Sequence, residues 1–80
     1  MILDIQRGHI KVGLKGRTAT IGGEAFLPGF GSPSFVANLE SLQLWDPPFE
    51  TEEISAEDKS AIIAGVRKEF EEKNMTIEFV

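Results

Sequence analysis

The side chains that could carry chemistry in this chain are few, and most of them are carboxylates. Cysteine is absent and His9 is the only histidine, which excludes disulfides, thiolate zinc sites, cysteine nucleophiles and metal sites with several histidines. A Ser–His–acid triad would have to use His9, which lies on the predicted solvent face of a hairpin. A carboxylate pair for glycoside hydrolysis is compatible with the composition, but so short a chain rarely encloses a substrate pocket. We therefore expect no enzymatic activity, no metal and no cofactor.

An acidic segment after the only tryptophan is the strongest candidate for a partner-binding surface. Its residues are Trp45, Asp46, Glu50, Glu52 and Glu53. A partly exposed Trp is a frequent hot spot of protein interfaces, and carboxylates around it would attract a basic surface. Alternatively, the Trp closes the edge of the core and the carboxylates complement the positive end of a helix dipole. Their spacing does not match a calcium-binding loop.

The charge of the chain is unevenly distributed. Residues 1–39 carry four basic and two acidic side chains, whereas residues 40–80 carry four basic and eleven acidic ones, for a net charge of −5. A protein that binds duplex nucleic acid needs an excess of Lys and Arg. The basic patch of the first half is weak and lacks the aromatic neighbours of single-strand binders: Arg7, His9, Lys11, Lys15 and Arg17. We expect no nucleic-acid partner. The acidic half either steers a basic protein or only provides solubility.

Length and composition indicate one small globular domain over residues 1–80. The chain is 41% hydrophobic and 26% charged, which argues against disorder. It contains no apolar run long enough for a membrane span or a secretory signal. We therefore expect a cytoplasmic protein that does not bind membranes.

Residues 1–22 predict a meander of three strands, because apolar and polar residues alternate in Ile2–Gln6, His9–Lys15 and Arg17–Ile21. A two-residue loop at Arg7-Gly8, with Gly8 at the positive φ of a type I′ turn, sets the first register. That register pairs Leu3 with Val12, Asp4 with Lys11 and Ile5 with Ile10. A loop at Gly16-Arg17, typical of a type II′ turn, sets the second register. This register pairs Val12 with Ile21, Leu14 with Ala19 and Lys15 with Thr18.

The segment 22–34 predicts an irregular loop, because it contains four Gly and two Pro. Gly29-Phe30-Gly31 is a poor phosphate-binding loop, since no helix follows it. We expect Phe26 and Phe30 to pack back onto the sheet. A fourth strand is predicted over 35–39, and a helical turn over 40–45 that ends before Pro47.

The second half of the chain predicts one helix and a closing strand. Ser55 is the expected N-cap of a helix over Ala56–Lys73, with Asn74 in the left-handed conformation after it. Ile62, Ile63, Val66 and Phe70 form its apolar stripe. The order β-β-β-β-α-β over the chain predicts an α+β fold with a mostly antiparallel sheet and the helix on one face. The last strand, 75–80, lies either beside the first strand, antiparallel, or beside the fourth strand, parallel.

Several short motifs follow one another along the chain. They are Arg7-Gly8-His9-Ile10, Gly23-Glu24, Phe35, the segment Ser41-Leu42-Gln43-Leu44-Trp45-Asp46-Pro47-Pro48, the capped helix, and Ile77-Glu78-Phe79. This pattern resembles the small bacterial proteins of the immunity protein 74 family. The family tends to carry Tyr in the fourth strand, where this chain has Val36, Ala37 and Asn38.

The resemblance implies a protein that binds and neutralises a cognate bacterial toxin domain without catalysis. Basic nucleases are one class of toxin that would suit an acidic partner. A small regulatory or self-associating interaction module, with another partner, is the alternative function.

Overall fold

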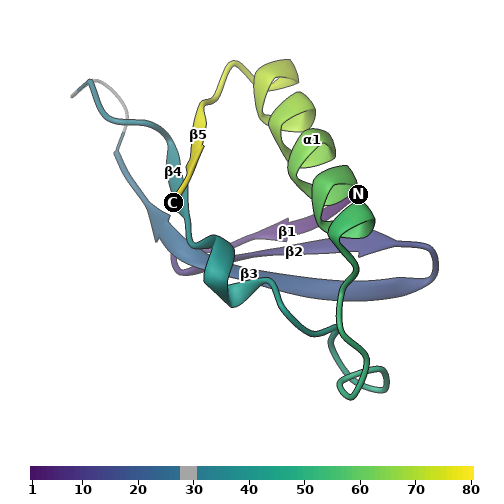
Figure 1. The fold of residues 1–80 in the computed structure, drawn as a ribbon. Coiled ribbons are helices and arrows are strands. Elements are labelled where there is room, and N and C mark those ends of the chain that lie inside the picture. The colour runs from purple at the N-terminus through teal and green to yellow at the C-terminus, as the bar shows by residue number, and fades with distance from the viewer. Residues whose placement is uncertain (28–30) are drawn as a thin grey trace.

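The computed structural model describes residues 1–27 and 31–80, and it is built from five strands and one α-helix (Figure 1). The elements are β1 (Ile2–Ile5), β2 (His9–Leu14), β3 (Arg17–Ala25), β4 (Phe35–Ala37), the 3₁₀ helix η1 (Leu39–Ser41), α1 (Ala56–Glu72) and β5 (Ile77–Phe79). The strands form one sheet in the order β1-β2-β3-β4-β5. Only β4 and β5 are parallel. The predicted α+β fold is confirmed. Of the two places predicted for the last strand, β5 occupies the one beside β4, parallel to it.

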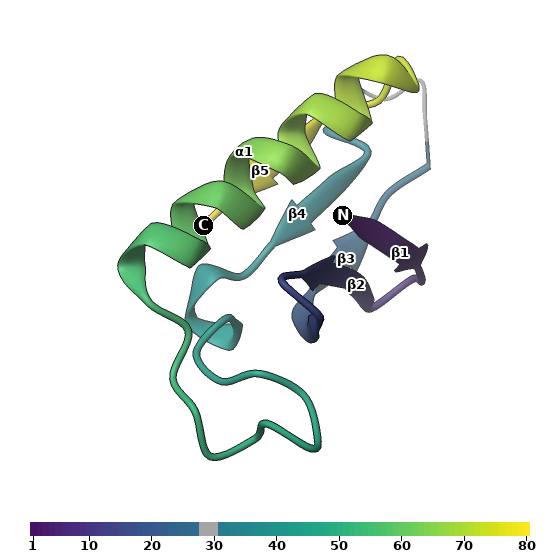
Figure 2. The same ribbon diagram turned by 90° about the vertical axis from the view of Figure 1, so that its right-hand side faces the viewer.

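The helix covers one face of a strongly twisted sheet, as Figures 1 and 2 show. Of the predicted stripe, Ile62, Val66 and Phe70 are completely buried, whereas Ile63 is half-buried. The ring of Phe70 meets that of Phe35 edge to face, with centroids 6.5 Å apart. The other buried residues come from β2, β3, β4 and the segment between η1 and α1: Ile10, Val12, Ala19, Ile21, Ala37, Leu42, Trp45 and Ile54.

The first hairpin has the predicted pairs Ile5–Ile10 and Asp4–Lys11, but a β-bulge follows. Val12 pairs with Ile2, so the predicted Leu3–Val12 pair is wrong and Leu3 is 60% exposed. The type I′ turn is also wrong, because Gly8 does not adopt a positive φ. Its carbonyl instead accepts a hydrogen bond from the Gly23 amide at 3.0 Å.

The second hairpin differs from its predicted register by two residues. The loop is Lys15-Gly16, with φ of 54° and 76°, as a type I′ turn requires. Consequently Val12 pairs with Ala19 rather than Ile21, and Leu14 with Arg17 rather than Ala19. The predicted Lys15–Thr18 pair is lost as well. A shift of two residues leaves every side chain on its original face, so the alternation alone could not exclude it.

β3 continues to Ala25, into the segment predicted as an irregular loop. This extension pairs with β4, where Gly23 lies opposite Ala37. A Cβ atom on Gly23 would collide with the Val36 carbonyl oxygen. Phe26, expected to pack on the sheet, is 40% exposed. The predictions for Gly29 and Phe30 lie outside the described residues.

Smaller corrections concern the ends of the other elements. β4 ends at Ala37, because the Asn38 side chain accepts from the Glu40 amide and starts η1, earlier than the predicted turn over 40–45. The helix begins as predicted, with Ser55 Oγ accepting from the Asp58 amide, but ends at Glu72. Asn74 has the predicted positive φ, 56°. Within the predicted last strand, the ladder covers only Ile77–Phe79.

Gly65 makes room on α1 for the first residue of the chain. A Cβ atom at this position would lie 2.9 Å from the Met1 methyl carbon. Four residues further along the helix, on the same side as Gly65, the Glu69 carboxylate accepts from the Ile2 amide at 3.1 Å. The N-terminal strand is therefore fastened to the helix by both packing and a hydrogen bond.

Val66→Asp should unfold the domain. An unpaired carboxylate in this core costs several kcal/mol, against a total stability of about 5 kcal/mol for so small a domain. Circular dichroism during thermal denaturation would measure it. Ala64→Asp places the same charge on an exposed position of α1 and should melt close to wild type. A Val66→Asp protein with a wild-type melting curve would contradict the assignment of the buried face.

Gly23→Ala should destabilise the protein by about 1–3 kcal/mol, the usual cost of overpacking. The added methyl group forces β3 and β4 apart at their closest approach. Gly8→Ala is the matched control, because nothing lies within 4 Å of a Cβ atom there. Urea denaturation would report both values, and equal stability of the two variants would contradict the close approach.

Candidate functional site

The acidic segment forms a loop over Asp46–Glu53, here called the acidic loop, which projects from the lower end of the molecule in Figure 1. Its two ends are held together by a short antiparallel contact. Trp45 donates its amide hydrogen to the Glu52 carbonyl at 3.3 Å, and Ile54 donates to the Gln43 carbonyl at 2.8 Å. Leu44 and Glu53 form an isolated bridge between them. The loop therefore has a defined base.

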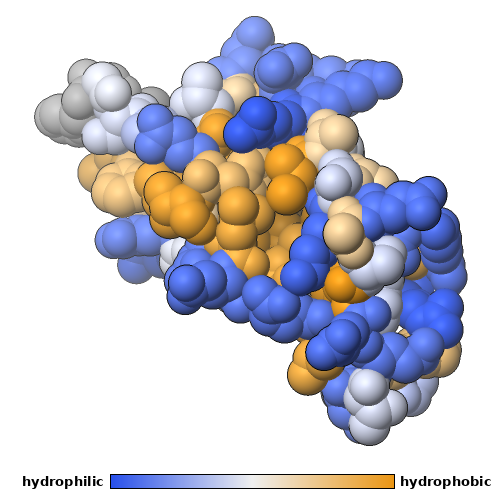
Figure 3. Space-filling model, viewed as in Figure 1, coloured by the Kyte–Doolittle hydropathy of each residue, from blue (hydrophilic) through white to orange (hydrophobic). Residues whose placement is uncertain are grey.

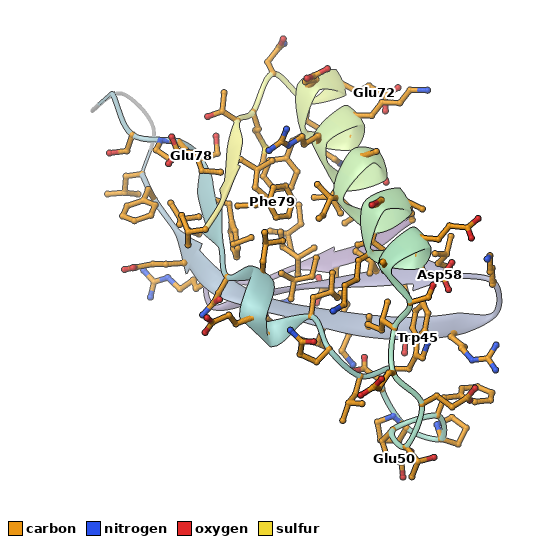
Figure 4. All side chains as sticks on the ribbon, viewed as in Figure 1. Trp45, Glu50, Asp58, Glu72, Glu78 and Phe79 are labelled. Atoms are coloured by element: carbon orange, nitrogen blue, oxygen red, sulfur yellow. The ribbon has the colours of Figure 1, made fainter. Side chains whose placement is uncertain are left out.

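Trp45 lies at that base and is only 5% exposed (Figure 4). It belongs to the same buried cluster as Leu42 and Ile54. Of the two roles considered for this residue, its burial agrees with closing the edge of the core. In this structure its ring is not available as an exposed anchor for a partner.

Asp46 is half-buried and ties the loop to β3. Its amide donates to the Thr18 carbonyl at 2.8 Å. Its carboxylate accepts from the Thr20 hydroxyl at 2.9 Å and from the Thr18 hydroxyl at 3.3 Å. Hydrogen bonds to a charged acceptor are about twice as strong as neutral ones. Asp46 is thus a positioning residue of the acidic loop.

Arg17 ties the middle of the loop to the β2–β3 turn. Its guanidinium carbon lies 4.3 Å from the centre of the Phe49 ring, a cation–π contact. One of its terminal nitrogens lies 3.1 and 3.2 Å from the two carboxylate oxygens of Glu52. This ion pair offsets part of the charge of Glu52. Sequence analysis missed the contact, because the two residues are 35 positions apart.

Glu50 and Glu53 are the exposed carboxylates of the loop that make no ion pair with a described residue. Both side chains are exposed, and neither has a hydrogen bond or ion pair among the described residues. Figure 4 shows Glu50 at the far end of the loop. The structure therefore brings Glu50, Glu52 and Glu53 together on one projecting element, with Trp45 and Asp46 beneath them.

A second ion pair lies between the β2–β3 turn and the start of α1. Lys15 Nζ lies 2.9 Å from Asp58 Oδ1, and the Asp58 side chain is 16% exposed. This hydrogen bond, with the charge attraction, raises the pKa of Lys15 and lowers the pKa of Asp58. Lys15 in the turn and Arg17 directly after it thus each pair with a carboxylate of the acidic half of the chain.

The segment Ser41–Pro48, one of the motifs that carry the family resemblance, has a structural function in this fold. Ser41 Oγ accepts from the Gly22 amide at 2.8 Å and donates to the Asn38 carbonyl at 2.6 Å. Together with Asp46, it holds the chain between η1 and the acidic loop against β3. Val36, Ala37 and Asn38 stand where the family tends to carry Tyr. They lie in or directly after β4, an interior strand.

Nothing in the described part of the chain resembles a catalytic centre. No polar or charged side chain there is buried, and no three acidic or histidine side chains gather as metal ligands would. A surface depression of about 450 Å³, open to solvent, lies beside Arg7, Gly23 and Glu24.

Asp58→Asn should lower the melting temperature at neutral pH, and the difference should disappear in acid. The lowered pKa of Asp58 means that its contribution is present above the ordinary carboxyl pKa and is lost as the pH falls through the lowered value. Because the pKa of Lys15 is raised, the ion pair's contribution to stability is lost at alkaline pH only above the ordinary lysine pKa. Melting curves from neutral to strongly acidic pH would test this.

Glu57→Gln removes a charge from the same helical turn and controls for the helix dipole. Its effect at neutral pH should be smaller than that of Asp58→Asn. A deficit of Asp58→Asn that persisted in strong acid would show that the ion pair is not its cause.

No helix in the described ranges is long and apolar enough to cross a membrane. No curated protein and no solved structure matches the chain. The family model described as Immunity protein 74 matches residues 2–80, essentially the whole sequence. The chain therefore belongs to the Immunity protein 74 family.

Proposed function

We propose that this protein binds a cognate bacterial toxin domain and neutralises it by occupying its surface, without catalysing a reaction. Membership of the Immunity protein 74 family is the observation that carries the proposal. The structure supports it, because an inhibitor needs only a stable scaffold and an exposed interface. The partner meets the protein in the cytoplasm of the producing cell.

The acidic loop gives the partner its chemical character. Asp46 and Arg17 hold the loop in place, and Glu50 and Glu53 remain directed to solvent. The matching surface on the toxin is basic. A nuclease fits this description, since an enzyme that acts on phosphates presents a basic surface to its substrate.

Within this proposal the residues of the site have two roles. Glu50, Glu52 and Glu53 attract the toxin, and Trp45 and Asp46 fix the loop that carries them. Exposed charges at an interface act mainly on the association rate. Because Glu52 is paired with Arg17, Glu50 and Glu53 are the residues to change in a test.

Glu50→Lys combined with Glu53→Lys should slow association with the toxin several-fold at low salt, and much less at high salt. The partner to test is the C-terminal domain of the toxin encoded beside this gene. Binding kinetics at two salt concentrations would measure the rates. The toxin's activity with and without the protein would report neutralisation.

Glu24→Lys combined with Glu72→Lys is the matched control. Both residues are exposed and lie outside the loop, and the net charge changes by the same amount. If both double variants slow association equally, only net charge matters and the loop is not the interface. If the wild-type protein neither binds nor neutralises the toxin domain, the proposed function is wrong.

A further inference from the structure

The outer edge of β5 leaves backbone groups unpaired. In a parallel ladder, alternate residues direct their amide and carbonyl groups to the same neighbouring strand. The backbone groups of Thr76 and Val80 point toward β4. Phe35 donates its amide hydrogen to the Thr76 carbonyl at 3.2 Å, and Val80 donates to the Ala37 carbonyl at 2.8 Å. Ile77 and Phe79 therefore direct their backbone groups outward, where no described residue pairs with them.

The opposite edge of the sheet is protected in the way that natural edge strands usually are. β1 is interrupted by the bulge at Leu3. The Ile2 amide is occupied by the Glu69 carboxylate. The edge of β5 has none of these features, so the two edges of the sheet are not equivalent.

An apolar surface lies beside this open edge. Figure 3 shows it as the continuous hydrophobic area in the centre of the view, the region where Figure 4 places Phe79. One depression of about 330 Å³ lies between α1 and β5, beside Arg67, Met75 and Ile77. Another, of about 240 Å³, lies between η1 and α1, beside Leu39 and Ile63. Val80 is 67% exposed.

Polar groups border this surface. The Arg67 guanidinium lies 5.3 Å from the centre of the Phe79 ring. Glu78 is exposed, between Ile77 and Phe79, and its side chain alternates to the other face of the sheet. A strand that pairs with β5 would therefore meet apolar side chains on one face and a carboxylate on the other.

We propose that β5 binds an extended strand of the toxin domain, which adds to the sheet as a sixth strand. This inference rests on the proposed function and identifies a second contact for it. Strand addition obtains affinity from main-chain hydrogen bonds and specificity from alternate side chains. The toxin strand carries Lys or Arg opposite Glu78 and apolar residues on the face that covers Phe79.

A second copy of this chain is a poorer occupant of the same edge. The two-fold antiparallel register that pairs Ile77 with Phe79 places Glu78 directly opposite Glu78 of the other copy. Like charges in directly opposed positions destabilise a sheet. A basic toxin strand reverses the sign of this interaction, in agreement with the net charge of −5.

The test compares two substitutions at one position. Ile77→Ala and Ile77→Pro both remove the side chain, but only proline removes the outward N–H. Proline is tolerated on an edge strand when its nitrogen faces away from the sheet. Ile77→Pro should bind the toxin domain about tenfold more weakly than Ile77→Ala, the ratio that corresponds to about 1.4 kcal/mol, within the range of one hydrogen bond.

Hydrogen exchange on the wild-type protein tests the edge without any substitution. The Ile77 and Phe79 amides should exchange markedly more slowly in the toxin complex than in the free protein. Equal affinities of the two variants together with unchanged exchange would overturn the strand-addition proposal while leaving toxin binding intact.

Two further outcomes separate this proposal from its alternatives. If light scattering shows a dimer that Ile77→Pro dissociates, the edge is occupied by a second copy and the proposal is overturned. If wild-type protein does not bind the toxin domain at all, the proposed function itself fails, and with it the partner named here.

Discussion

The close approach of β4 to β3 at Gly23 holds the two halves of this protein in one sheet. The meander β1–β3 comes from the first half of the chain, and α1 and β5 come from the second. β4 is the strand between them, and it pairs with β3 where only a glycine fits under the Val36 carbonyl. β5 pairs with β4 alone, so its open edge exists only because this contact forms.

The alternation of apolar residues predicted the elements of this fold better than their pairing. Val66 and its neighbours on the helix follow from a local period of 3.6 residues, and Ser55 and Asn74 are local capping signals. The same alternation does not determine the register of β2 and β3, because a shift of two residues leaves every side chain on the same face of the sheet. It was decided by the Lys15-Gly16 turn, whose two positive φ angles were not evident from the sequence.

The acidic loop illustrates the same limit for a functional site. Composition identified its carboxylates, but not which of them the fold uses internally. The Asp46 carboxylate accepts a hydrogen bond from β3, and the Glu52 carboxylate pairs with Arg17. Both partners are distant in sequence. Trp45 could be read as anchor or as core, because its burial depends on how the segment after η1 folds back. All three Glu side chains of the loop are exposed, but among the described residues only Glu50 and Glu53 make no ion pair.

Two kinds of contact are combined in the proposed complex, and they act at different distances. Carboxylates of the acidic loop attract a basic surface over roughly a Debye length, about 8 Å at physiological salt, before the partners touch. The edge of β5 acts only at hydrogen-bonding distance, and it selects a partner that has a free strand with side chains that match those of β5. Many basic proteins would satisfy the first requirement, and few of them present an unpaired strand with Lys or Arg opposite Glu78. In the proposed complex, discrimination of the cognate toxin therefore depends on β5, and the speed of capture depends on the loop.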